Sequence, residues 1–133
     1  IRHGLDMAFS SNLNQLLNWG SHFQIDINGA ESPEELAVHQ LDLWIKSTRL
    51  ILEMRQSHPD RIYLLRHDGL CLNPEPEIEE LMAFCKLEVN GQTLKQLAQI
   101  PDLPSSHNRY KGKGLHIFRS DQLNDLQELG FAI

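Results

Sequence analysis

The chain has 133 residues, of which 41% are hydrophobic and 23% are charged, and its formal net charge is -6. This composition is typical of one globular domain and excludes wholesale disorder, and no apolar run is long enough to span a bilayer. The negative charge argues against nonspecific nucleic-acid binding, which depends on basic side chains that neutralise phosphates.

Helical spacing of apolar residues begins near the start of the chain. The pattern from Leu5 to Trp19 predicts one helix, and Gly20 provides a stop. The following segment, residues 21–31, contains Asn28-Gly29 and is predicted to be a loop. The histidines in this part of the chain are interpreted as ordinary surface or partly buried residues.

A second helix is predicted from Pro33 to about Gln56. Ser32 is placed to be its N-cap, Pro33 is at the first helical position, and Glu35 completes a capping box. Trp44 lies on the apolar stripe of this helix, where core packing is the simplest interpretation.

The rest of the chain alternates an apolar run with short helices. The segment from Arg61 to His67 is rich in strand-forming residues and predicts a buried strand. Further helices are expected at Glu75–Lys86, Gln92–Gln99 and Asp121–Leu129, the last with Ser120 as N-cap and Gly130 as stop. This order favours an α/β class of fold.

Two separate stretches could bind an anion. Arg2 ends the first apolar segment, and Ser10 follows within a helix that would begin after it, so a helix N-terminus, a guanidinium and a hydroxyl could converge. The plainer interpretation is that Arg2 pairs with Asp6 at the surface and Ser10 has no role.

The second stretch is "NRYKGKG", within the long segment 100–118. There Arg109, Lys111 and Lys113 alternate with Gly112 and Gly114. Glycines allow close backbone approach to a ligand, and basic side chains neutralise its charge, although an exposed turn would have the same composition. A loop of this length usually has a function.

Three segments resemble the PAPS-dependent sulfotransferase family. "IRHGLDMAFS" is similar to the family's 3′-phosphate-binding segment, with Arg2, Asp6 and Ser10 in register and Gly4 where Pro is usual. "RIYLLRHDGLCLNPEPEIEELMAFCKL" is similar to the next segment. "SSHNRYKGKGLHIFRSDQLNDLQELGF" resembles the C-terminal loop and helix, in which an Arg-Lys-Gly sequence closes over the nucleotide.

This resemblance implies an α/β fold of the P-loop type, with three layers and a parallel sheet, in which residues 1–133 form one helix-rich partial domain. It implies PAPS as co-substrate and no metal. Of the cofactor-binding residues, Arg2 and Ser10 would hold the 3′-phosphate from one side, and Arg109, Lys111 and the Gly112 backbone from the other. The family's phosphosulfate-binding loop and catalytic base precede the Arg2 segment, so the resemblance assigns no catalytic residue here.

The implied function is transfer of the sulfuryl group to a hydroxyl or amine of a small-molecule, carbohydrate or peptide acceptor. The alternative is a noncatalytic remnant that binds a nucleotide or another protein. A P-loop kinase relative is disfavoured because the sequence has no glycine-rich Walker motif. The two cysteines, Cys71 and Cys85, are interpreted as reduced packing residues, so we expect a cytoplasmic protein. From the apolar runs and the net charge we expect no transmembrane segment and no nucleic-acid partner.

Overall fold

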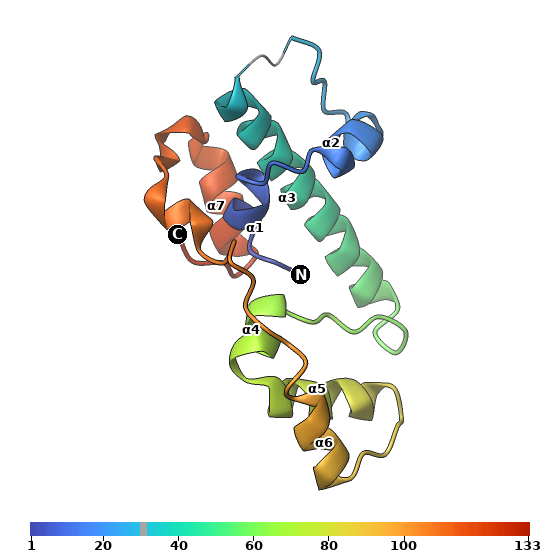
Figure 1. Cartoon of the computed structure of the whole chain (residues 1–133). Coiled ribbons are helices and arrows are strands. Elements are labelled where there is room, and N and C mark those ends of the chain that lie inside the picture. The colour runs from blue at the N-terminus through green and yellow to red at the C-terminus, as the bar shows by residue number, and fades with distance from the viewer. Residues whose placement is uncertain (30–31) are drawn as a thin grey trace. The chain divides into compact units, whose positions relative to one another are not determined.

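A computed structural model of the chain describes residues 1–29 and 32–133. All regular secondary structure in these residues is helical (Figure 1). The chain divides into two compact units: unit 1 comprises residues 1–2 and 53–107, and unit 2 comprises residues 3–52 and 108–133. None of the helices in the described residues combines the length and the apolar character that crossing a bilayer requires.

Unit 2 is built around the long helix α3, Pro33–Ser57, which continues into unit 1 for its last residues. The other helical elements of this unit are α1 Gly4–Ala8, α2 Asn14–Trp19, η1 Gly20–Phe23, η2 Arg109–Gly112, η3 Leu115–Ile117 and α7 Ser120–Glu128. The predicted capping box of α3 is confirmed: Glu35 N donates to Ser32 Oγ at 3.1 Å, and Ser32 N donates to Glu35 Oε2 at 3.0 Å.

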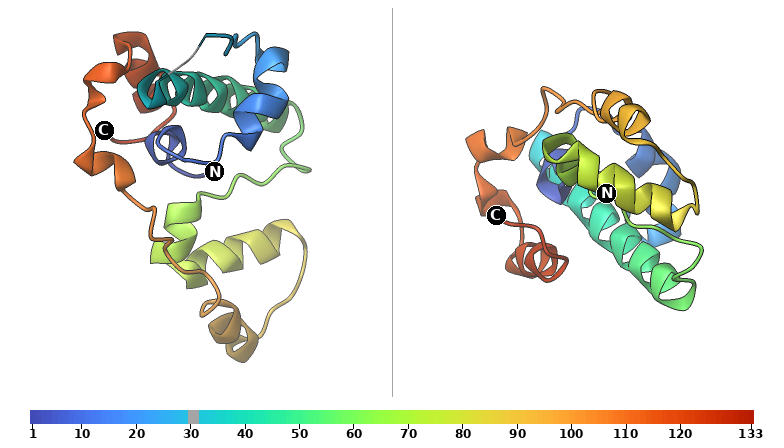
Figure 2. Two further views of the ribbon diagram at one scale, coloured as in Figure 1. Left: turned by 45° about the horizontal axis from the view of Figure 1, so that its top comes forward. Right: turned by 90° about the horizontal axis from the view of Figure 1, so that it is seen from below.

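The core of unit 2 brings α1, α3 and α7 together (Figure 2). Gly4, the first residue of α1, is buried against Trp44 of α3 and Leu126 of α7. The indole of Trp44 also packs edge-on against Phe131, with ring centroids 5.0 Å apart. Trp44 is therefore a core residue, as its place on the apolar stripe predicted.

A polar network also joins α7 to α3. The Gln122 side chain is 1% exposed, and its Nε2 donates to Val38 O at 2.9 Å and to Asp42 Oδ1 at 2.8 Å. Arg119, which precedes α7, donates its guanidinium to both oxygens of Asp42, at 2.9 and 3.3 Å. Buried polar groups are stable when their hydrogen bonds are satisfied, so this network fixes α7 on α3.

Unit 1 contains three helices, α4 His67–Leu72, α5 Pro74–Phe84 and α6 Gly91–Leu97. Figures 1 and 2 show α5 and α6 side by side, and each buries one apolar residue, Ile78 and Leu94 respectively. Asn90 caps α6 by accepting a hydrogen bond from Thr93 N at 2.9 Å. Helix α4 was not predicted.

The predicted α/β fold with a parallel sheet is wrong, because the described residues contain no strand. The predicted strand, residues 61–67, does not form. Residues 62–66 lie outside any regular element, Arg66 is extended, and the segment is paired with Ile1: Ile1 N donates to Leu65 O, and His67 N donates to Ile1 O at 2.8 Å. These two bonds follow the parallel pattern, but a pairing with one residue does not make a ladder.

The helix predicted from Leu5 to Trp19 is also interrupted. It forms as α1 and α2, with residues 9–13 non-helical between them. The loop predicted over residues 21–31 begins as η1, and its last residues, 30 and 31, lie outside the described part of the chain. Near the C-terminus, Gly130 ends α7 with a positive φ of 81°, as predicted, and Phe131 N donates to Leu126 O at 3.1 Å.

Candidate functional site

Helix α1 positions Ser10 within unit 2. His3 begins the helix by accepting a hydrogen bond from Leu5 N on its Nδ1 at 3.2 Å, and its ring is stacked on Tyr110, with centroids 4.6 Å apart. Leu5 and Ala8 are fully buried, which anchors the helix in the core. Ser10 follows the C-terminal end of α1, so it does not lie within a helix, although the sequence predicts that it does.

Two hydrogen bonds hold the basic segment 109–113 beside the C-terminal end of α1. Asn108 N donates to Asp6 Oδ2 at 2.9 Å, and Arg109 Nη1 donates to the carbonyl of Phe9 at 3.1 Å. Asn108 has a positive φ of 58°, a conformation that asparagine tolerates better than most residues, and it turns the chain into η2. The two predicted anion-binding stretches of unit 2 therefore meet, although about 100 residues separate them.

The members of the segment differ in exposure. Tyr110 is 6% exposed and fixes the segment on His3, whereas Lys111, Gly112 and Lys113 are exposed. A Cβ added to Gly112 would meet no atom within 4 Å, so the space above its backbone is open. The ammonium of Lys111 and the Gly112 backbone can thus reach a ligand on this side of the unit.

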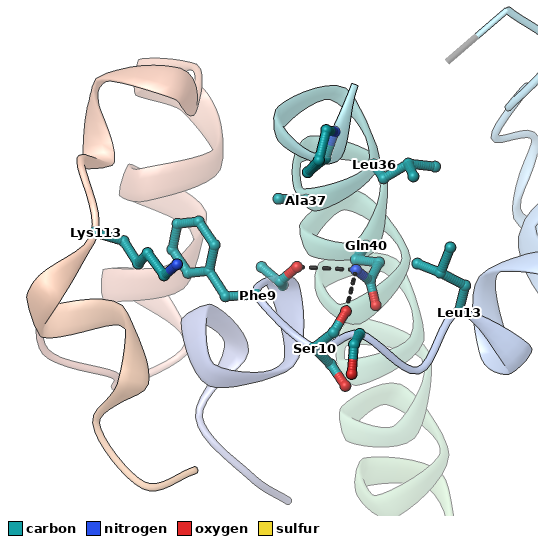
Figure 3. Close-up of a pocket in the computed structure, with 10 residues that line it drawn as sticks. Phe9, Ser10, Leu13, Leu36, Ala37, Gln40 and Lys113 are labelled. Carbon is teal, nitrogen blue, oxygen red and sulfur yellow. Dashed lines mark hydrogen bonds between the residues drawn. The ribbon is translucent and has the colours of Figure 1, made fainter. Parts of the chain in front are cut away.

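A cavity of about 280 Å³ lies next to Ser10 (Figure 3). Gln40 of α3 fixes one of its edges, because Nε2 donates to Ala8 O at 2.9 Å and to Ser10 O at 3.0 Å. Phe9 and Lys113 lie on one side in Figure 3, and the Lys113 ammonium is 5.9 Å from the centroid of the Phe9 ring. Leu13 and Leu36 lie on the other side.

Sequence reasoning missed Gln40 as part of this site. It lies on α3, 30 residues from Ser10 along the chain, and no local pattern separates it from other helical glutamines. Lys113 was noted in the basic segment but was not among the predicted site residues. Its spacing from Lys111 contained no sign that it would line a cavity with Ser10.

Arg2 belongs to unit 1, whereas Ser10 belongs to unit 2. Arg2 Nη2 donates to Ser106 Oγ at 2.8 Å. Burial raises the pKa of the nearby Cys71 thiol, Asp68 and Asp102 raise it further, and Arg2 opposes them. The structure thus brings Ser10, Arg109, Lys111 and Gly112 into one unit and leaves the role of Arg2 a prediction.

Both cysteines are free, and Cys85 is exposed, so the interpretation of Cys85 as a packing residue is wrong. In the described residues, no group of three or more histidine, cysteine, aspartate or glutamate side chains is arranged to hold a metal ion. Comparison of the chain with protein-family models, with curated proteins and with solved structures gave no match.

Proposed function

We propose that this chain binds the 3′-phosphate of a phosphoadenosine nucleotide such as PAPS, with Ser10 on one side and the segment 109–112 on the other. In that role it contributes to sulfuryl transfer from PAPS to an acceptor hydroxyl or amine. The observation that supports this most directly is the hydrogen bond from Arg109 to Phe9 O, which holds the basic segment beside Ser10.

The chemistry of these residues fits a phosphate group. Ser10 Oγ accepts a hydrogen bond from Asn12 N at 3.2 Å, so the hydroxyl hydrogen can be donated to a phosphate oxygen. Lys111 contributes an exposed positive charge, and charge-assisted hydrogen bonds to phosphate are stronger than neutral ones. These residues bind and orient the nucleotide, and none of them is assigned a part in the chemical step.

The resemblance of three segments to the sulfotransferases adds the choice of nucleotide. It aligns Arg2, Ser10 and the basic segment with the part of the family site that holds the 3′-phosphate. The second candidate function, a noncatalytic nucleotide-binding module, would use the same residues, so a binding experiment tests what the two have in common.

Calorimetric titration with 3′-phosphoadenosine 5′-phosphate and with adenosine 5′-phosphate tests the proposal. We expect the 3′-phosphorylated nucleotide to bind at least about tenfold more tightly, and Ser10→Ala and Lys111→Met each to weaken it by about three- to tenfold. Neither variant should change the affinity for adenosine 5′-phosphate. Arg2→Ala in the same series tests the predicted role of Arg2.

Lys95→Met is the matched control, because Lys95 is exposed on α6 in the other unit and its loss changes the net charge equally. Equal affinity for the two nucleotides, or equal effects of Lys95→Met and Lys111→Met, would contradict the proposed site. Sulfuryl transfer is tested separately, with radiolabelled PAPS and a panel of acceptors.

A further inference from the structure

We infer that the cavity beside Ser10 is a second ligand site, which binds a small amphiphilic anion: a short hydrocarbon body with one carboxylate or sulfate head. The inference goes beyond nucleotide binding and depends on the walls of the cavity and on Lys113, which are not needed for the 3′-phosphate site (Figure 3).

The walls of the cavity favour a hydrocarbon body. They come from α1, the segment before α2, and the first two turns of α3, and their apolar members are Ala8, Phe9, Leu13, Pro33, Leu36 and Ala37. A volume of about 280 Å³ is at the lower limit of ordinary ligand pockets, so the body is limited to a short chain or a single ring.

The charge around the cavity favours an anionic head. Lys113 lines the cavity, and among residues 1–29 and 32–133 no carboxylate forms an ion pair with it. None of the described residues that line the cavity is acidic. An anion that reaches the Lys113 ammonium therefore gains a charge-assisted hydrogen bond without a competing acid.

Gln40 weakens the repulsion that backbone carbonyl oxygens would exert on an anion in the cavity. The carbonyl oxygens of Ala8 and Ser10 border the cavity, and both accept hydrogen bonds from Gln40 Nε2, which lowers the negative potential that they would present to an anion. Ser10 and Ser11 also line the cavity, and the Ser11 hydroxyl can donate to the head group.

Titration followed by heteronuclear NMR, with four six-carbon ligands, tests the inference. Hexanoate and hexyl sulfate are expected to shift the amides of residues 8–13 and 36–40, and comparison of the two distinguishes a planar from a tetrahedral head. 1-Hexanol should bind about tenfold more weakly, and hexylamine more weakly still. Equal affinity for hexanoate and hexylamine would refute the anionic part of the inference.

Variants separate this site from the nucleotide site. Lys113→Met should reduce the affinity for hexanoate to that of 1-hexanol, whereas Lys111→Met, an exposed neighbour that does not line the cavity, should leave hexanoate binding unchanged. Ser11→Phe should fill the cavity from an exposed position and weaken all four ligands. Unchanged hexanoate binding in both Lys113→Met and Ser11→Phe would overturn the inference.

The two proposals fail in different ways. If nucleotide binding is absent but hexanoate binds and responds to Lys113→Met, the cavity is a ligand site and the proposed function is wrong. If the nucleotide binds as expected and no six-carbon anion binds at millimolar concentration, only the present inference is wrong.

Discussion

The burial of Gly4 predicts that a single added methyl group will destabilise unit 2. A Cβ at this position would lie 2.7 Å from Cε3 and 2.8 Å from Cδ2 of Trp44, and 2.9 Å from Cδ1 of Leu126. Carbon atoms in favourable contact are about 3.5–4.0 Å apart, so the helices must move to accept it. In the sequence, Gly4 is notable only because it stands where Pro is usual in the family that the segment resembles, whereas the structure requires it for close packing.

The expected change in the free energy of unfolding of Gly4→Ala follows from two opposing effects. Overpacking of a core by one methyl group costs about 1–3 kcal/mol, and alanine gains at most about 1 kcal/mol over glycine in a helix. The indole of Trp44 cannot turn away easily, because Phe131 packs against it. We therefore expect Gly4→Ala to lower the free energy of unfolding by about 1–2 kcal/mol.

Urea denaturation followed by far-UV circular dichroism measures this difference. Gly91→Ala is the matched control, because Gly91 is also the first residue of a helix, α6, and a Cβ there would meet no atom within 4 Å. It should be neutral or slightly stabilising. In the double variant Gly4→Ala/Leu126→Ala, the cost of the first substitution should fall, because one of the clashing atoms is removed. Equal effects of Gly4→Ala and Gly91→Ala would refute the reasoning.

Three further predictions concern other contacts. Gln122→Leu should cost about 2–3 kcal/mol in thermal unfolding, because it removes the hydrogen bonds that the buried Gln122 side chain makes with Val38 O, Asp42 Oδ1 and Arg119 N. Asn108→Gly should leave stability within about 0.5 kcal/mol, whereas Asn108→Val should cost about 1–2 kcal/mol, because of the positive φ. Burial and the hydrogen bond to Glu80 raise the pKa of Tyr63, so its neutral form contributes stability that is lost as the pH rises above about 10. Tyr63→Phe should therefore flatten the alkaline limb of stability measured by urea denaturation.

Local signals predicted the helices better than the fold. The capping box at Ser32 and Glu35 and the glycine stop at Gly130 depend on neighbours in sequence, and both are observed. The class of fold depended on the segment 62–66 forming a ladder with other strands. A strand-forming composition favours an extended backbone, which is observed at Arg66, but it cannot supply the partner that a sheet needs.

The interruption between α1 and α2 shows a second limit of sequence patterns. Apolar spacing continues through residues 9–13, but the carbonyls of Ala8 and Ser10 are bonded to Gln40, and that of Phe9 to Arg109. These side chains satisfy backbone groups at the end of α1 that a continuous helix would have satisfied internally. The contacts that break the helix come from residues about 30 and 100 positions away, so no window of local sequence contains them.

The same contacts explain why the candidate site does not depend on the predicted sheet. The hydrogen bonds that hold Asn108 and Arg109 to Asp6 and Phe9 lie entirely within unit 2, whereas the segment 62–66 belongs to unit 1. The error about residues 62–66 therefore leaves the geometry around Ser10 unchanged. It follows that the nucleotide titrations of Ser10→Ala and Lys111→Met test the binding chemistry itself, since both residues lie in unit 2.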